Sequence, residues 1–205
     1  MKIFIIGKGK AGKSAFSFFK EIKKKVHFFK KKSRIKKKCF LIDLSNRKKI
    51  KFILKKCYKK KIKVIIGTTG FNKNDIKKIK LFSKKIPIFI CCNFNFFFWK
   101  FLEIVKEAKK LLHNKKTAIL EKHSLKKKDC PSGSSLVLGK IIKPTSINSF
   151  RYSNTLGTHR VYFFDRRNEV SIEHKCKKKI GMFNTLPKFL FFLKKKRKGL
   201  FVYPK

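Results

Sequence analysis

The stretch that decides the fold is Ile3-Phe-Ile-Ile-Gly-Lys-Gly-Lys-Ala-Gly-Lys-Ser14, near the start of a chain of 205 residues. Residues 3–6 are a continuous apolar run, which is typical of a strand buried in a parallel sheet. A glycine-rich turn follows at residues 7–12, and residues 14–22 carry apolar side chains at helical spacing. This order of strand, turn and helix predicts the first unit of a parallel α/β domain.

The same alternation continues along the first half of the chain. Short apolar runs that suit buried strands occupy residues 26–29, 39–44, 64–66 and 86–91. A polar link is expected at residues 34–38. Helical spacing recurs at residues 50–58, 75–83 and 99–112. Strands that alternate with helices indicate a parallel sheet with helices on its faces.

After about residue 117 the pattern changes to one with more strands. Residues 160–164 and 169–174 alternate between apolar and polar side chains, which predicts an antiparallel hairpin with its turn at residues 165–168. Further strands are expected at residues 117–120 and 150–152, with a short helix at residues 134–140. We therefore expect a second, sheet-forming domain, followed by a C-terminal helix and tail.

The formal net charge of +48 would on its own suggest a nucleic-acid-binding protein. The 58 basic residues, however, comprise 51 lysines and 7 arginines, whereas recognition of phosphates and base edges favours the forked arginine side chain. Lysine is abundant together with phenylalanine, as A+T-rich coding DNA would produce. We interpret most of the charge as a solvated surface and expect no specific nucleic-acid partner.

The cysteines and the apolar runs indicate where the protein works. The six cysteines show neither a C-x-x-C pair nor zinc-ligand spacing, so we expect reduced thiols, no metal site and a cytoplasmic protein. The apolar run after Lys2 is too short for a signal peptide. The runs at residues 94–99 and 189–193 are too short to cross a bilayer, and no membrane partner is expected.

The glycine-rich turn fits two nucleotide-binding motifs at once. Gly7, Gly9 and Gly12 match G-x-G-x-x-G, in which a dinucleotide pyrophosphate approaches the N-terminus of a helix. Gly7 and Gly12, followed by Lys13 and Ser14, equally match the P-loop of ATP- and GTP-binding proteins. Both interpretations stay open here, because a lysine after a glycine is common in so lysine-rich a chain.

Two further features resemble parts of a P-loop protein. Asp43 ends an apolar run, as a magnesium-binding acidic residue would, and Asn72-Lys-Asn-Asp75 imitates a guanine-recognition motif. A P-loop protein would leave two other stretches unexplained, at residues 67–71 and 121–134.

The stretch at residues 121–134 is the most informative about chemistry. It reads Glu-Lys-His-Ser-Leu-Lys-Lys-Lys-Asp-Cys-Pro-Ser-Gly-Ser and combines residue types that are scarce elsewhere in the chain. His123 can donate a proton near neutral pH, and Lys127 can act as a fixed cation or a proton donor. The backbone N–H groups after Pro131 can hold an anion at a helix start. A proton donor, a cation and an anion cradle together suit the reduction of an acidic small molecule.

Taken in chain order, these motifs resemble those of the 4-hydroxy-tetrahydrodipicolinate reductase (dihydrodipicolinate reductase) family. The resemblance runs nearly from one end of the chain to the other. The specific matches are Gly67-Thr-Thr-Gly-Phe71 and residues 121–134, which resemble Glu-x-His-His-x-x-Lys-x-Asp-Ala-Pro-Ser-Gly-Thr. The first loop resembles Gly-x-Gly-Lys-Met-Gly. Supporting matches lie at residues 41–45, 93–94, 157–159, 169–175 and 198–201.

The resemblance implies a fold and a reaction. It implies an α/β protein whose Rossmann-like parallel-sheet domain, residues 1–95 with residues 186–205 returning to it, holds NADH or NADPH. An α+β mixed-sheet domain of residues 96–185 would bind the substrate and build a homotetramer. The enzyme would be an NAD(P)H-dependent oxidoreductase that reduces 4-hydroxy-tetrahydrodipicolinate or dihydrodipicolinate, a small dicarboxylate, to tetrahydrodipicolinate in lysine and diaminopimelate biosynthesis.

The resemblance also implies roles for individual residues. His123 would be the proton donor and Lys127 the second catalytic group, and Ser124, Gly133 and Ser134 would bind the substrate. The cofactor would lie along three loops that contain Gly7, Gly9, Lys10, Ala11, Gly12, Gly67, Thr68, Thr69, Cys91, Cys92, Asn93 and Phe94.

The chain departs from the family pattern at several places. Ser124 stands where the family usually has a second histidine, residues 95–99 differ in the third cofactor loop, and residues 139–150 look shortened. No acidic residue follows the second expected strand to hold an NAD ribose. Lysines 30–32 stand there instead; they can accommodate a 2′-phosphate but are ordinary in this composition. The choice between NADH and NADPH stays open, and the P-loop and nucleic-acid alternatives are kept.

Overall fold

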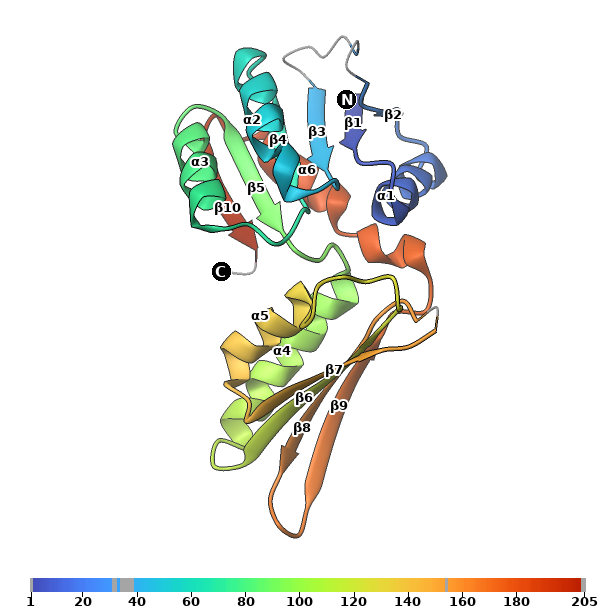
Figure 1. Ribbon diagram of the computed structural model, residues 1–205, viewed down its shortest axis with the longest axis vertical. Coiled ribbons are helices and arrows are strands. Elements are labelled where there is room, and N and C mark those ends of the chain that lie inside the picture. The colour runs from blue at the N-terminus through green and yellow to red at the C-terminus, as the bar shows by residue number, and fades with distance from the viewer. Residues whose placement is uncertain (1, 31–32, 34–38, 154, 204–205) are drawn as a thin grey trace. The chain divides into compact units, whose positions relative to one another are not determined.

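The computed structural model describes residues 2–30, 33, 39–153 and 155–203 of the chain. It divides into two compact units, one of Met1–Phe94 with Phe183–Lys205 and one of Asn95–Met182 (Figure 1). The polar link predicted at residues 34–38 lies outside the described residues. So do Lys31 and Lys32, two of the lysines considered for a 2′-phosphate.

The first unit is built on a six-stranded sheet with the strand order β10-β5-β4-β3-β1-β2, and all of its pairs are parallel. The strands are β1 (Lys2–Ile6), β2 (Val26–Phe28), β3 (Cys39–Asp43), β4 (Lys63–Ile66), β5 (Pro87–Cys91) and β10 (Gly199–Tyr203). The helices are α1 (Lys10–Glu21), α2 (Ile50–Lys59), α3 (Lys73–Ser83) and α6 (Leu186–Lys194). The predicted parallel α/β fold is confirmed for this unit.

Helices cover both faces of this sheet, which explains why its strands read as continuous apolar runs. On one face, α2 and α3 contribute Ile53, Leu54 and Ile79 to a core that also contains Leu41 and Val64. On the other face, α6 packs its phenylalanine rings against Phe89 of β5. Figure 1 shows α2 and α3 in front of the sheet and α6 behind it.

The Asn72-Lys-Asn-Asp75 motif is a helix cap rather than a guanine-recognition site. The Asn72 side chain accepts a hydrogen bond from the Asp75 N–H at 2.9 Å, and the Asp75 carboxylate accepts one from the Asn72 N–H at 3.3 Å. Arg47 Nη1 lies 3.2 Å from the same carboxylate. This reciprocal capping box starts α3 and accounts for both side chains.

We expect Asn72→Ala to lower the free energy of unfolding by about 1 kcal/mol, because a first-turn N–H group of α3 loses its side-chain acceptor. Chemical denaturation measures the change. Asn46→Ala is the matched control, since Asn46 precedes a 3₁₀ helix at Arg47–Lys49 and makes no side-chain cap bond. Equal effects of the two substitutions would contradict the capping role.

Lys63 fastens the C-terminal part of the chain to the parallel sheet. Its ammonium group donates hydrogen bonds to the carbonyl oxygens of Leu193, Lys194 and Lys196 at the end of α6. A cation at this end of a helix satisfies carbonyl groups that have no partner within the helix. The segment that follows α6 becomes β10, which pairs with β5 at the edge of the sheet.

The second unit has a four-stranded mixed sheet with the order β7-β6-β8-β9. Its strands are β6 (Lys116–His123), β7 (Ser146–Arg151), β8 (Thr158–Phe164) and β9 (Glu169–Lys175), and its helices are α4 (Phe96–Leu111) and α5 (Gly133–Ile142). The predicted hairpin is β8 with β9, and β7 is parallel to β6. The expected mixed-sheet class is confirmed.

Several boundaries differ from the sequence prediction. Strand β6 continues to His123, three residues beyond the expected end at residue 120, and β7 starts at residue 146 rather than 150. Helix α4 starts at Phe96 instead of residue 99, because the Asn95 side chain accepts a hydrogen bond from the Phe97 N–H. The longer β6 matters most, because it places the candidate site residue His123, together with Glu121, on a strand rather than in a loop.

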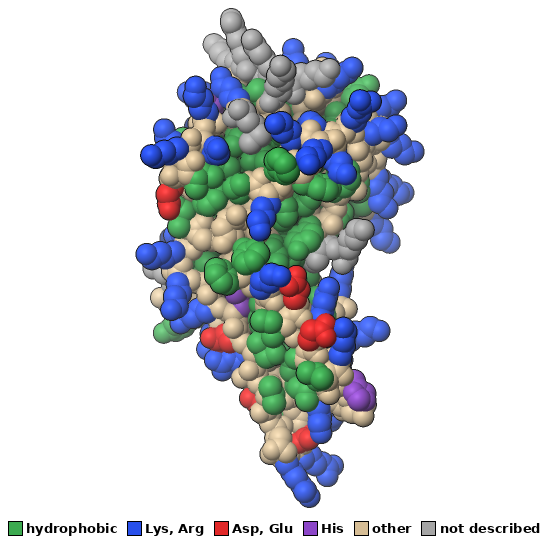
Figure 2. All heavy atoms as spheres, turned by 180° about the vertical axis from the view of Figure 1, so that it is seen from behind, with side chains coloured by type: hydrophobic (Ala, Val, Ile, Leu, Met, Phe, Trp, Pro, Cys, Tyr) green, Lys and Arg blue, Asp and Glu red, His purple; other side chains and the backbone are tan. Residues whose placement is uncertain are grey.

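No helix among the described residues is long and apolar enough to cross a membrane. Lysine and arginine side chains are spread around the face shown in Figure 2, between apolar and neutral polar groups. This distribution agrees with the interpretation of the charge as a solvated surface.

Candidate active site

The loop after β1 has the shape expected of an anion-binding glycine loop. Gly7 has a φ of +107°, and a Cβ there would lie 2.2 Å from the Leu44 carbonyl oxygen. A Cβ at Gly12 would lie 1.9 Å from the Gly7 carbonyl oxygen, so both positions require glycine. Gly9 is different, because a Cβ there would meet nothing within 4 Å. Gly9 is the N-cap residue of α1 and has no side chain that could cap the helix. The N-terminus of α1 is therefore open to an anion.

The predicted magnesium-side groups of a P-loop have other uses in this fold. Ser14 Oγ donates a hydrogen bond to the Lys10 carbonyl oxygen at 2.9 Å, within α1. Asp43 is fully buried and accepts hydrogen bonds from Ser45 Oγ at 2.6 Å and Thr68 Oγ1 at 3.0 Å. Burial raises the pKa of Asp43, and these hydrogen bonds only partly oppose the rise. The geometry therefore favours the dinucleotide interpretation of the loop.

The loop after β4 is tied to the loop after β3. The Gly67 N–H donates to the Asp43 carbonyl oxygen at 2.8 Å, and the Ser45 N–H donates to Thr68 Oγ1 at 3.2 Å. A Cβ at Gly67 would lie 2.6 Å from both Leu44 and Phe94 side-chain atoms. The carboxyl ends of these parallel strands thus meet at one edge of the sheet, where open α/β folds bind their ligands.

The third predicted cofactor loop follows β5 and is partly structural. Cys91 ends β5, and its thiol donates to the Asn93 carbonyl oxygen at 2.7 Å; burial raises the pKa of this thiol. The Phe94 carbonyl oxygen accepts two hydrogen bonds from Thr185, and the Phe94 ring is buried against Phe183. Other predicted cofactor residues are exposed at the surface: Lys10, Ala11 and Thr69.

In the second unit, Glu121 is the centre of a buried polar cluster. Its carboxylate is fully buried and accepts hydrogen bonds from the Ser132 N–H at 3.0 Å, Ser135 Oγ at 2.6 Å and Arg151 Nη2 at 3.1 Å. Burial raises the pKa of Glu121, but hydrogen bonds from His123 and these serines outweigh burial and hold the pKa well below its usual range. Glu121 is therefore a fixed negative charge at neutral pH.

His123 lies between this carboxylate and a second histidine. Its Nε2 is 3.5 Å from Glu121 Oε2 and 3.3 Å from His159 Nε2. The strand register produces this row, because Glu121 of β6 pairs with His159 of β8, which pairs with His174 of β9. Burial, followed by repulsion from His123 and His174, lowers the pKa of His159 to about 3, so His159 is neutral near pH 7.

Gly157 provides the room that the His123 ring needs. Its φ is +144°, and a Cβ there would lie 2.9 Å from His123 Cε1 and 3.2 Å from Nδ1. A side chain at this position would push the imidazole out of the cluster.

Lys127 lies in the turn between β6 and α5, where it pairs with Asp129. Its ammonium group is 2.9 Å from the Asp129 carboxylate. Burial raises the pKa of Asp129, but the hydrogen bond and the charge of Lys127 produce a net decrease. Arg151 binds the same turn by donating hydrogen bonds to the carbonyl oxygens of Lys127 and Asp129. One arginine therefore connects Glu121 to the turn that carries Lys127.

The predicted substrate residues lie at the two ends of this turn. The Ser124 carbonyl oxygen accepts a hydrogen bond from the Lys127 N–H at 2.9 Å. Gly133 and Ser134 are the first residues of α5, and Ser132 caps this helix by accepting a hydrogen bond from the Ser135 N–H. The helix N-terminus with its N–H groups is a suitable place for a carboxylate.

Three members of this cluster received no role from the sequence: Glu121, Ser135 and Arg151. His159, which lies in a supporting family match, was expected only as a hydrogen-bonded polar residue of the second domain. The single local signal was the alternation of Glu121 and His123 with exposed Lys122, which continues the buried face of β6. The partners come from other strands and from α5, and no local pattern predicted that register.

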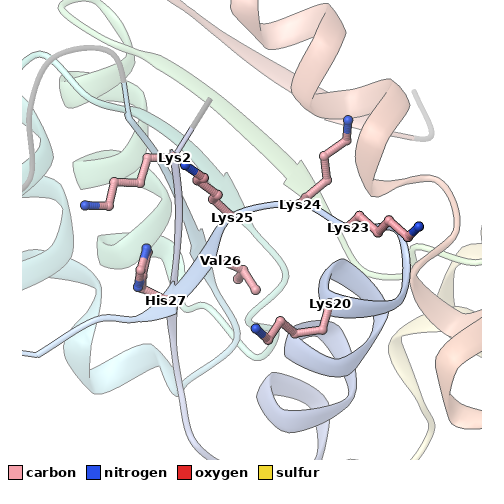
Figure 3. Close-up of a pocket in the computed structure, with 7 residues that line it drawn as sticks. All are labelled: Lys2, Lys20, Lys23, Lys24, Lys25, Val26 and His27. Atoms are coloured by element: carbon pink, nitrogen blue, oxygen red, sulfur yellow. The ribbon is translucent and has the colours of Figure 1, made fainter.

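A separate basic hollow of about 610 Å³ lies at the opposite end of β1 from the glycine loop. Figure 3 shows the residues that line it, which are Lys2, Lys20, Lys23, Lys24, Lys25, Val26 and His27. None of them is a predicted site residue.

A parallel-sheet unit with a glycine-rich anion cradle, joined in one chain to a unit with a buried histidine cluster, defines a two-domain dehydrogenase type of protein. The chain belongs to the dihydrodipicolinate reductase family: the model described as "Dihydrodipicolinate reductase, N-terminus" matches residues 6–94, and the one for the C-terminus matches residues 100–203. The family resemblance inferred from the motifs is confirmed.

Similar proteins agree with this assignment. A 4-hydroxy-tetrahydrodipicolinate reductase of Buchnera aphidicola subsp. Cinara cedri (strain Cc) is 33% identical, over 89% of this chain and 78% of the relative. One from Wigglesworthia glossinidia brevipalpis is 34% identical over 66% of this chain, and the match spans 55% of that relative. The dipicolinate-bound dihydrodipicolinate reductase from Paenisporosarcina sp. TG-14 shares the fold, with a TM-score of 0.72 at 15% identity, over 98% of this chain and 97% of that chain.

Proposed function

We propose that this protein is an NAD(P)H-dependent oxidoreductase that reduces 4-hydroxy-tetrahydrodipicolinate to tetrahydrodipicolinate in lysine and diaminopimelate biosynthesis. The observation that carries the proposal is His123, which lies against a buried carboxylate in the most specific motif of the family. The conversion adds a hydride and a proton to the substrate, and the hydroxylated ring also loses water. We assign cofactor binding and delivery of the proton to residues of this chain.

The first unit is proposed to hold NADH or NADPH at the carboxyl ends of its strands. Gly9 leaves open space before α1, and Gly7 and Gly12 bring the backbone close, as a pyrophosphate requires. The loop at residues 67–69 and the segment at residues 91–94 would line the same cofactor. When bound, the reduced nicotinamide supplies the hydride.

The second unit is proposed to hold the dicarboxylate and to protonate it. His123 acts as the proton donor, and Glu121, whose Oε2 lies 3.5 Å from His123 Nε2, is a positioning residue that holds the imidazole in place. Lys127 is the second catalytic group. The N-terminus of α5, at Gly133 and Ser134, would bind a carboxylate of the substrate, with Ser124 beside it.

Turnover by the purified full-length chain tests this function. The substrate is made in place by the preceding synthase, and oxidation of NADH and of NADPH is followed in parallel. We expect oxidation of at least one cofactor that depends on the substrate, and the two rates give the preference. If neither cofactor is oxidised, while magnesium–ATP binds and that binding is lost in Lys13→Ala, the P-loop alternative is correct and the proposal fails.

We expect Gly9→Asp to weaken cofactor binding by about tenfold or more, because a carboxylate would stand at the pyrophosphate position, where the two negative charges repel. The fold should tolerate the side chain, since a Cβ at Gly9 meets nothing within 4 Å. Nicotinamide fluorescence measures the dissociation constant.

Gly181→Asp is the matched control, because a Cβ at Gly181 also meets nothing within 4 Å. It adds the same charge and is expected to leave cofactor affinity within about twofold of that of the original protein. Equal losses in both variants would mean that overall charge, rather than the loop, controls binding.

A homotetramer, built through the second unit, remains part of the proposal. Phe150 and Tyr152 lie at the end of β7 and are about half and two-thirds exposed, at 51% and 68%. Apolar side chains exposed on the free side of a sheet suit an interface between copies. Light scattering on the purified chain measures its mass in solution.

A further inference from the structure

We propose that Glu121, His123 and His159 form a binding site for zinc or a similar divalent transition-metal ion, and that the bound ion prevents His123 from donating a proton. The second half of this statement rests on the proposed function, whereas the first half does not. The cysteine spacing in the sequence predicted no metal site, and the three ligands proposed here come instead from two different strands.

Two of the three separations between the donor atoms match those of metal ligands. One donor atom from each residue lies within 4.8 Å of the other two. His123 Nε2 is 3.3 Å from His159 Nε2 and 3.5 Å from Glu121 Oε2. Ligands bound at about 2.0–2.2 Å to a tetrahedral zinc ion stand roughly 3.3–3.5 Å apart. Two of the three separations therefore already have the length found in a tetrahedral site, and the third, between Glu121 and His159, is at most 4.8 Å.

The surroundings hold the ligands in place as metal sites require. Glu121 is fixed by Ser132, Ser135 and Arg151, which resembles the outer hydrogen bonds that orient metal-binding carboxylates. The His159 ring packs against Phe98, with ring centroids 5.4 Å apart. Both histidines offer Nε2, and all three ligands lie on strands, which are rigid supports.

The ligand types select the kind of ion and the kind of site. Two imidazoles and one carboxylate suit zinc, cobalt or nickel better than magnesium or calcium, which prefer oxygen ligands. Three protein ligands leave a fourth position for water, as in open rather than closed zinc sites. Because Glu121 already pairs with Arg151, we expect an affinity below that of closed structural zinc sites.

Direct metal binding to the full-length chain is the test, before any substrate is added, since a dicarboxylate with a ring nitrogen is itself a chelator. Zinc is titrated against a coloured chelator, and cobalt is followed by its visible absorption. We expect one equivalent to bind and His159→Asn to weaken it by more than the roughly 10–100-fold that loss of an outer partner causes. His174→Asn is the control, because His174 is buried in the neighbouring strand and is not a ligand.

X-ray absorption of the zinc-loaded original protein needs no variant and is decisive if a variant fails to fold. Nitrogen and oxygen ligands with two imidazoles support the site, whereas sulfur ligands would place the ion on a cysteine and overturn it. Unchanged binding in His159→Asn would overturn it as well. Inhibition of turnover by zinc, reversed by a chelator, tests the blocking of His123. Failure of that arm alone, with binding intact, would reject the functional consequence and not the site.

Discussion

Replacing Glu121 with glutamine is expected to lower the free energy of unfolding by about 3 kcal/mol at neutral pH. The carboxylate is fully buried and accepts hydrogen bonds from Ser132, Ser135 and Arg151. The amide would leave the Arg151 guanidinium without its carboxylate and would turn an N–H₂ group toward donors. Chemical denaturation of the two proteins measures the difference.

The pH dependence of this difference separates an ionic role of Glu121 from a loss of packing. Hydrogen bonds outweigh burial and hold the folded pKa of Glu121 well below its usual range, while the unfolded value is about 4.3. Glu121 is ionised in both states from about pH 8 to pH 5, so the difference is flat there. Below about pH 4 the unfolded chain takes up a proton that the folded chain does not, and the difference shrinks. A difference that keeps its size at low pH would contradict the ionic role.

Glu103→Gln provides the matched control for this substitution. Glu103 forms an ion pair with Lys100 at 2.7 Å on the surface of α4, and its side chain is 57% exposed. Solvent screens such a pair, so the same chemical change is expected to cost less than about 0.5 kcal/mol. A comparable loss of unfolding free energy in both variants would show that the buried Glu121 carboxylate contributes no more to stability than a surface carboxylate does.

Helices and strands whose residues follow one regular pattern of burial were predictable from the sequence. Residues 3–6 and 86–91 are apolar throughout because both faces of a parallel strand are covered, and β1 and β5 were expected close to where they lie. The hairpin of β8 and β9 was predictable because alternate residues face opposite sides of the sheet. The glycine loop was ambiguous until Asp43 and Ser14 were seen to have structural partners.

The buried polar cluster was not predictable, because its burial depends on partners distant in the sequence. Glu121 and His123 look like loop residues, and the expected strand therefore stopped at residue 120. They are buried because α5 begins beside β6 and supplies the N–H group of Ser132 and the hydroxyl group of Ser135. Local patterns report whether a position is apolar, whereas only the register reports whether a buried polar group finds its partners.

Replacing His123 with alanine is expected to lower kcat by about 10²–10⁴-fold, the usual contribution of a positioned proton donor. His159 cannot substitute for it, since burial and neighbouring histidines lower the pKa of His159 to about 3 and leave it neutral, without the acidic imidazolium proton, near pH 7. Glu121 Oε2 lies 3.5 Å from His123 Nε2 and holds this imidazole in place. The measurement is steady-state reduction of substrate with the preferred cofactor.

The His123→Ala result needs two accompanying measurements to identify a proton donor. Cofactor affinity is expected to stay within about twofold, because the glycine loop belongs to the other unit. His113→Ala, at an exposed histidine after α4, is expected to keep full activity. Full activity in His123→Ala would instead transfer the proton-donor role to Lys127, whose ammonium group lies in the same motif, 2.9 Å from Asp129. A Lys127→Ala variant would then lose the activity that His123→Ala retains.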